Sequence, residues 1–405
     1  MHFTQWGELQ KKSLFYLQRA PKTAFALAIV QVKMVYSFCR RGETGVSVLY
    51  LKEQGAYVQK IGDRIIVTKS GQTLLDIPVF QVDNIAIIGN VQITTQALHM
   101  LMLHGVDVSY FTRSGGYLGM TAAESARNIF LRFEQYRCFM EEQKRMEIAR
   151  CIVDGKIRNQ MDMIRTYRWT GIDHDWHSDL DRMEQIRQSI PDRADSHELM
   201  GTEGVCSQIY FGAFAAMLKC NFRNDSHVFR GRNRRPPKDP VNVILSLAYT
   251  FLTREVCSVL EAESFEPYLG FLHGIRYGRK SLALDLVEEF RQPAVDRLVL
   301  MLFNKQMLSS YDFDFDEGEN RVILNEEGYK TFCREYERWM SGRNSAAGDP
   351  SFRNRIRQQV AALRKTIQKG EPYITYSLKR ESEVKEVVSE NAALGGSASD
   401  EGSTL

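Results

Sequence analysis

The sequence lacks the signatures of several large classes of protein. Its 405 residues include seven cysteines, no two of which form a CxxC pair, so a zinc ribbon is disfavoured. The odd, scattered set also argues against a disulfide framework and fits the reducing cytoplasm. No run of about 20 apolar residues predicts a membrane-spanning helix. We therefore expect a cytoplasmic protein with no membrane partner.

The nearly balanced charge and the absence of common catalytic motifs exclude further classes of protein. The 53 Lys and Arg residues nearly balance the 50 Asp and Glu residues, and the net charge of +3 excludes a histone-like cation. The sequence contains no GxxxxGK[ST], no GxGxxG after a predicted strand, no GxSxG and no HExxH. ATP hydrolysis, hydride transfer and serine-hydrolase chemistry lose most of their support.

The region from residue 46 to about 120 reads as β-structure. Two β-rich runs, 56–60 and 64–68, flank the turn Gly62-Asp63 and predict a hairpin. A stretch of helix formers at 92–104 stops at Gly105 and predicts one helix among the strands. Further strands are predicted at 46–51, 74–77, 84–88 and 106–111.

From Thr121 onward the apolar residues recur with a period of 3.6, which predicts helices. The order of strands first and helices after favours an α+β fold, with a β-strand domain containing one helix before a larger all-helical domain. The predicted helices are 122–152, 155–169, 196–218, 240–262, 292–305 and 325–341. We divide the chain into an N-terminal extension (1–45), a β-domain (46–122), a helical catalytic domain (123–345) and a C-terminal region (346–405), which has a basic helix at 351–369 and a disordered acidic tail.

Two segments imitate metal sites. Residues 173–177 (DHDWH) lie in a polar stretch between predicted helices, where a solvated loop is the better interpretation. Residues 312–316 (DFDFD) resemble the start of a calcium loop. The sixth position is Glu317 instead of Gly and the twelfth is Ile323 instead of Glu, so the match fails where it matters.

Four other residues form a more informative set. Glu203 lies between Gly201 and Gly204, although alone it would fit an acid in the first turn of a helix. His273 ends an apolar stretch, although alone it would fit a histidine of the core. If their segment is helical, Asp285 and Glu288 share one face of an otherwise apolar run. Acids in such a setting require partners or a cation. One imidazole with carboxylates suits Mn²⁺ or Mg²⁺ better than a zinc–thiolate site.

A basic segment lies between Glu203 and His273. Residues 229–238 (FRGRNRRPPK) contain five cations and no acid, and two prolines prevent a helix there. Such a loop is often only a solvated surface, but its position favours contact with phosphates. The candidates for contact with the phosphates of a nucleic acid are Arg230, Arg232, Arg234, Arg235 and Lys238, with Lys156 and Arg158 of a second cluster at 155–160.

Several strings of the sequence closely resemble the CRISPR-associated integrase family, Cas1. They occur in the family's order, cover roughly residues 46 to 342, and are long enough to be specific. The matching strings are LYLKEQGAYV (49–58), GNVQITTQAL (89–98), GKIRNQ (155–160), GRNRRPPKDPVN (231–242), YLGFLHG (268–274) and SLALDLVEEFR (281–291). Residues 1–45 and the tail after about 345 have no counterpart in this pattern.

The resemblance implies an architecture, an assembly and a metal site. Family members have an N-terminal β-domain, through which they form homodimers, and a helical domain. Two dimers clamp a dimer of the small partner Cas2, giving a heterohexamer that inserts captured DNA into the CRISPR array. The family's metal ligands look like Glu203, His273 and Glu288 here, with Asp285 as a supporting acid and Glu289 as the competing third ligand.

The resemblance therefore implies a metal-dependent DNA integrase and endonuclease of CRISPR adaptation that uses Mg²⁺ or Mn²⁺. The expected substrates are double-stranded and branched DNA, and the nucleophile is the 3′-hydroxyl of the captured DNA. One alternative is a stand-alone structure-specific nuclease acting on branched DNA with the same ligands. Another is a non-catalytic scaffold that bridges DNA and partners.

Overall fold

The structure, a computed structural model, describes residues 48–82, 84–113, 115–121, 128–168, 174–219, 228–233, 236–316, 321–342 and 350–378. The predicted N-terminal extension (1–45) and acidic tail (381–405) lie outside these residues, as do Arg234 and Arg235 of the basic loop. The predictions for these parts of the chain stay predictions.

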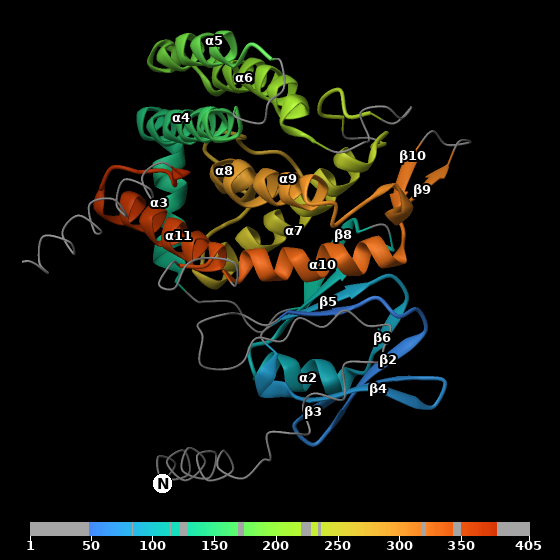
Figure 1. Cartoon of the computed structure of the whole chain (residues 1–405). Helices are drawn as coiled ribbons and strands as arrows, with labels where there is room; N and C mark the ends of the chain where they lie inside the picture. The colour runs from blue at the N-terminus through green and yellow to red at the C-terminus, as the bar shows by residue number, and fades with distance from the viewer. Residues whose placement is uncertain are drawn as a thin grey trace, which may run out of the picture. The chain divides into compact units, whose positions relative to one another are not determined.

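Strands fill the first part of the described chain and form two four-stranded sheets (Figure 1). One sheet has the order β1 (Val48–Leu51), β5 (Asn84–Ile88), β7 (Asp107–Phe111), β8 (Tyr117–Thr121), with only β8 antiparallel to its neighbour. The other has the order β4 (Gln72–Pro78), β3 (Arg64–Lys69), β2 (Ala56–Ile61), β6 (Val91–Ile93), followed by helix α2 (Thr95–Leu103). The predicted β2–β3 hairpin is confirmed, and its turn uses Gly62 at a φ of +56°.

Helices dominate the rest, so the predicted α+β order is confirmed. A π-helical segment (Arg291–Asp296) joins α8 to α9, and it contains Pro293, which has no N–H for a regular helix. The helices are α3 (Ile129–Met140), α4 (Glu142–Tyr167), α5 (Trp176–Gln188), α6 (Ser196–Met217), α7 (Pro240–Ala262), α8 (Ser281–Phe290), α9 (Arg297–Asn304), α10 (Glu326–Met340) and α11 (Phe352–Lys369).

Some predicted boundaries were wrong. The chain does not break between 152 and 155, because α4 runs through Gly155 and the break falls at Glu141. A Cβ atom at Gly155 would lie 2.3 Å from Thr375 Oγ1, so this glycine admits the C-terminal segment and does not end a helix. The sequence also did not predict α5, β6, β8 or the hairpin of β9 (Phe313–Asp316) and β10 (Arg321–Leu324).

Helix α7 is a core helix that connects the helical part to the first sheet. It begins as predicted, with Asp239 accepting a hydrogen bond from the Asn242 N–H at 2.8 Å. The ring of Phe251 stacks on Tyr50 of β1 with centroids 5.8 Å apart. Among the described residues, α7 is the one helix that is long and apolar enough to cross a membrane, although no such helix was expected from the sequence. Most of its apolar stretch is buried inside the protein, as in a core helix.

Candidate active site

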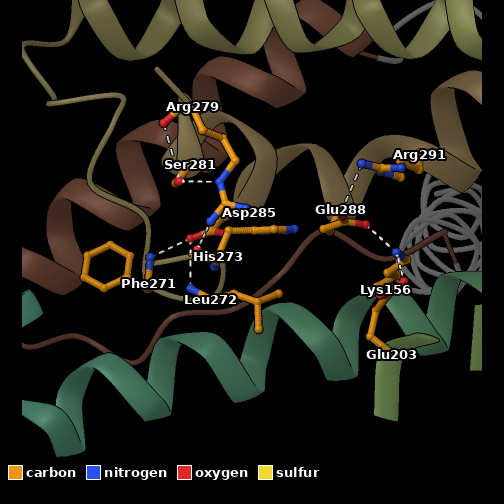
Figure 2. A network of polar contacts seen from close by, with 10 residues as sticks. All are labelled: Lys156, Glu203, Phe271, Leu272, His273, Arg279, Ser281, Asp285, Glu288 and Arg291. Carbon is orange, nitrogen blue, oxygen red and sulfur yellow. Dashed lines mark hydrogen bonds and ion pairs between the residues drawn. The ribbon is translucent and has the colours of Figure 1, made fainter. Parts of the chain in front are cut away.

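The candidate site lies where three helices and one loop meet. Helix α4 contacts both α6 and α8, which places Lys156, Glu203 and Glu288 side by side (Figures 1 and 2). The loop before α8 adds His273, and α8 itself adds Asp285 (Figure 2). The packing of these helices therefore gathers residues that are far apart in the sequence.

The ammonium group of Lys156 lies between two carboxylates. Lys156 Nζ forms an ion pair with Glu203 Oε1 and lies 2.5 Å from Glu288 Oε2. The lysine side chain is only 6% exposed. Glu203 Oε1 also accepts a hydrogen bond from Ser207 Oγ at 2.6 Å. Lys156, predicted as part of a DNA-binding cluster, is thus turned into the site.

Glu288 is a buried acid with positive charges around it. Burial opposes its ionisation, but the charges of Arg291, Lys156 and His273 outweigh burial and hold its pKa at about 2. Arg291 Nη2 lies 3.1 Å from Glu288 Oε1. Glu288 Oε2 is buried and lies 2.5 Å from the Lys156 ammonium group, so this oxygen already faces a positive charge. A cation could therefore bind at this oxygen.

Asp285 shapes the loop that presents the histidine. Its fully buried carboxylate accepts the N–H groups of Phe271 and Leu272 at 2.5 and 3.0 Å, and that of His273 at 3.0 Å. It also lies 2.7 Å from His273 Nδ1, which must donate because a carboxylate only accepts. A Cβ atom at Gly270 would lie 2.8 Å from Asp285 Oδ2, so glycine permits this close approach. Asp285 thus leaves His273 Nε2 free to bind a cation.

The environment of His273 favours a positive charge. Burial lowers the pKa of His273, but the hydrogen bond and charge of Asp285 and the charge of Glu288 more than compensate, so its pKa lies above the usual value. A histidine that binds a metal ion must be neutral, and metal binding would therefore release any proton held on Nε2.

Glu289 has other partners. Its carboxylate accepts hydrogen bonds from the Tyr373 hydroxyl, from the Tyr376 N–H at 2.9 Å and from Gln359 Nε2 at 2.7 Å. Burial raises its pKa to about 7 despite these hydrogen bonds. Because both of its oxygens are engaged by α11 and the segment after it, the geometry favours Glu288 as the third acid.

A cavity of about 770 Å³ opens beside the site. Lys156 and Glu203 form part of its wall, and three arginines also line it. The other lining residues are Gly204, Ser207, Gln208, Phe211, Gly212, Arg230, Gly231, Arg232, Tyr249, Arg291 and Gln292. Guanidinium groups around an acidic site are suited to bind phosphates beside a metal ion.

The predicted DNA-binding residues differ in their surroundings. Arg230 and Lys238 are exposed, whereas Arg232 donates hydrogen bonds to Asn242 Oδ1 at 2.7 Å and Ser246 Oγ at 3.0 Å, so it also holds the loop together. Arg158 pairs with Asp154 at 2.7 Å on the outer side of α4.

The predicted basic helix, α11, is not a free basic surface. Arg353 is buried between two acids, 2.9 Å from Glu255 of α7 and 2.7 Å from Glu337 of α10. Arg364 pairs with Glu263 at 2.5 Å. These ion pairs dock α11 on the helical core, so Arg353 and Arg364 serve the fold, whereas Arg357 is exposed.

The residues present fit a divalent cation. In the described part of the chain, no three His, Cys, Asp or Glu side chains form a ready-made metal-binding group, and the ammonium group of Lys156 lies between the two glutamates. Glu203 and Glu288 nevertheless share one cation already, the ammonium group of Lys156. Carboxylate oxygens with one imidazole are donors that Mg²⁺ and Mn²⁺ accept. Glu203, His273 and Glu288 would hold such an ion.

The comparisons with known proteins identify the family. The family model described as CRISPR associated protein Cas1 matches residues 49–338, so the chain belongs to the Cas1 family. It is 36% identical over 298 residues to the CRISPR-associated endonuclease Cas1 3 of Thermus thermophilus, covering 73% of this chain and 85% of that protein. It also resembles a Cas1 protein from Thermotoga maritima, with a TM-score of 0.70, 26% identity, and coverage of 82% of this chain and 99% of that one.

Two further solved structures share the fold. A chain of a Cas6-RT-Cas1–Cas2 complex has a TM-score of 0.70 and 24% identity, over 84% of this chain and 37% of that one. A casposase bound to integration product has a TM-score of 0.69 and 22% identity, over 82% of this chain and 93% of that one.

Sequence reasoning missed two polar residues of the site, Arg291 and Ser207, and predicted a different role for Lys156. Arg291 follows Glu288 by three positions, and this spacing on one helix could have indicated a pair. Ser207 follows Glu203 by four positions and gave a similar signal. The position of Lys156 had no local signal, because it depends on how α4 packs against α6 and α8.

Proposed function

We propose that this chain is a metal-dependent DNA integrase and endonuclease of CRISPR adaptation. The observation that supports this most is the convergence of Glu203 and Glu288 on one cation, next to a histidine oriented by Asp285 and a cavity lined with arginines. Such a site suits a divalent ion and a phosphodiester together. The naming of the 36%-identical relative as an endonuclease supports the same class of activity.

The chain supplies orientation and charge for this reaction. A bound Mg²⁺ or Mn²⁺ would lower the pKa of a hydroxyl nucleophile and stabilise negative charge at the reacting phosphate. Asp285 keeps the His273 ring in place, while Arg230 and Arg232 are positioned to bind the DNA backbone.

No nucleophile from the protein is required. The 3′-hydroxyl of captured DNA attacks a target phosphorus, a new P–O bond forms, and the target strand's 3′-oxygen leaves and takes up a proton. Water in the place of the 3′-hydroxyl gives hydrolysis, which accounts for an endonuclease activity at the same site.

The proposal extends to assembly and location. The expected substrates are double-stranded and branched DNA, and the expected assembly is a homodimer formed through the β-domain that joins Cas2 in a heterohexamer. The presence of a chain of this fold in a complex with Cas2 supports that partner. We place the protein in the cytoplasm.

The test follows the 3′ end of a labelled DNA. The full chain, with Cas2, is incubated with a donor duplex bearing a labelled 3′-hydroxyl and a target containing a repeat, in Mg²⁺, Mn²⁺ or EDTA. Covalent joining that needs the divalent ion and fails with a 3′-dideoxy donor is expected. Cleavage without joining would favour the stand-alone nuclease, and binding without any product would favour the scaffold.

A further inference from the structure

The lysine in the site lies where a metal ion is expected. Lys156 Nζ contacts Glu203 Oε1 and lies 2.5 Å from Glu288 Oε2, the two acids proposed as ligands. The lysine side chain is 6% exposed and the Glu288 side chain 4%, so solvent screens their charges little. The buried Glu288 carboxylate and the half-buried Glu203 carboxylate would repel one another without a cation, and the ammonium group removes that repulsion.

A divalent ion and this ammonium group compete for the same oxygen atoms. The other oxygen of Glu288, Oε1, faces Arg291 Nη2 at 3.1 Å, so it offers no alternative place for the lysine. A metal ion bound between Glu203 and Glu288 would repel the adjacent positive charge. Lys156 must therefore leave the position between the acids when the ion enters.

The cavity gives the displaced side chain a destination. Lys156 itself lines this cavity of about 770 Å³, along with Arg230 and Arg291. A lysine side chain is flexible and carries a compact charge, so it can turn from one anion to another without moving its helix. If DNA binds in this cavity, one of its phosphates would be the nearest anion available to the lysine.

We propose that Lys156 is an exchangeable counter-ion, which holds Glu203 and Glu288 together in the metal-free protein and moves to a DNA phosphate when the divalent ion binds. The inference rests on the proposed function, because it takes these two glutamates as metal ligands. Lys156 is then a positioning residue with two alternating partners. The Cas1 site would thus be kept folded and charge-balanced before it is loaded.

The first test measures the binding of Mn²⁺ alone. Lys156→Met removes the competing charge, so the full chain should bind Mn²⁺ at least about tenfold more tightly, equivalent to about 1.4 kcal/mol. Lys144→Met makes the same change at an exposed lysine of the same helix, paired with Glu141 at 2.7 Å, and should leave the Mn²⁺ affinity unchanged. Equal or weaker Mn²⁺ binding by Lys156→Met would overturn the proposal.

Thermal unfolding provides a second readout and a safeguard against misfolding. In EDTA, Lys156→Met should unfold at a lower temperature than the wild type, and Mn²⁺ should raise its unfolding temperature more than it raises that of the wild type. Lys156→Gln, which retains a hydrogen-bond donor, should show the same pattern less strongly. An equal Mn²⁺ response in all three proteins would contradict the exchange.

DNA binding tests the second half of the exchange. In Mn²⁺, Lys156→Met should reduce the dependence of log affinity on log salt by about 0.9 for a branched duplex, the value of one phosphate contact. In EDTA the two proteins should have equal slopes, and a slope unaffected by Mn²⁺ would refute the movement to phosphate. Failure of the wild type to bind Mn²⁺ would refute the proposed function as well, whereas normal binding with no effect of Lys156→Met would refute the role of the lysine alone.

Discussion

Replacing Asp285 with alanine should have two effects that can be measured separately, one on the stability of the protein and one on metal binding. The Asp285 carboxylate accepts four hydrogen bonds, from the N–H groups of residues 271–273 and from His273 Nδ1, and it is fully buried. A buried donor left without a partner costs about 1–3 kcal/mol. If water and relaxation satisfy two of the four donors, Asp285→Ala should lower the free energy of unfolding by about 2–6 kcal/mol.

The same change should weaken metal binding. Without Asp285, the His273 ring loses the hydrogen bond at Nδ1 that orients it, and the loss of such a partner costs about 10–100-fold in metal affinity. Urea unfolding in EDTA measures the stability, and a Mn²⁺ titration below the unfolding transition measures the affinity.

A core substitution in the β-domain provides the matched control. Ile65 of β3 is fully buried, and Ile65→Ala should also cost about 2–5 kcal/mol. This control should bind Mn²⁺ with the wild-type affinity. If Asp285→Ala is destabilised as calculated but binds Mn²⁺ as tightly as the control, Asp285 only supports the fold and our reasoning about His273 is refuted.

Three further predictions concern neighbouring parts of the molecule. Glu289→Ala should reduce strand transfer less than Glu288→Ala, since Glu289 holds the C-terminal segment; the reverse order in a strand-transfer assay would make Glu289 the ligand. Replacing exposed Arg230 and Lys238 with glutamine should weaken DNA binding and make its salt dependence shallower by about 0.9 per lost phosphate contact, with an unchanged slope marking the loop as a solvated surface. Phe80→Glu alters an exposed aromatic side chain of the β-domain and should convert dimers to monomers in sedimentation, whereas persistent dimers would place the interface elsewhere.

Much of the fold could be predicted because it follows local patterns. The β2–β3 hairpin has its glycine turn, and α7 has the capping Asp239 followed by Pro240. The failures come from tertiary packing. Gly155 reads as a helix break, yet α4 continues through it because Thr375 packs where a side chain would lie. The short strands β6 and β8 gain stability from their neighbours in the sheets and have weak patterns of their own.

The site was only partly accessible to sequence reasoning. Spacing placed Asp285 and Glu288 on one helix, and the resemblance to Cas1 singled out Glu203 and His273. Lys156 and its partner Glu203 are 47 positions apart in the sequence. No local pattern encodes a contact over such a distance. Within a basic cluster the lysine therefore looked like a surface contact for DNA, although it is buried. Arg353 was read as part of a basic helix for the same reason, although it pairs with buried Glu337.

The central claim is that Glu203, His273 and Glu288 together hold the divalent ion that phosphodiester transfer requires. The most direct measurement is the joining of a labelled 3′-hydroxyl DNA to a repeat-containing target by His273→Ala, in Mn²⁺, with circular dichroism confirming that the protein is folded. The account predicts that joining is abolished, because two carboxylates alone leave the ion weakly held and misplaced. Joining at the wild-type rate by a folded His273→Ala protein would contradict the assignment of the site.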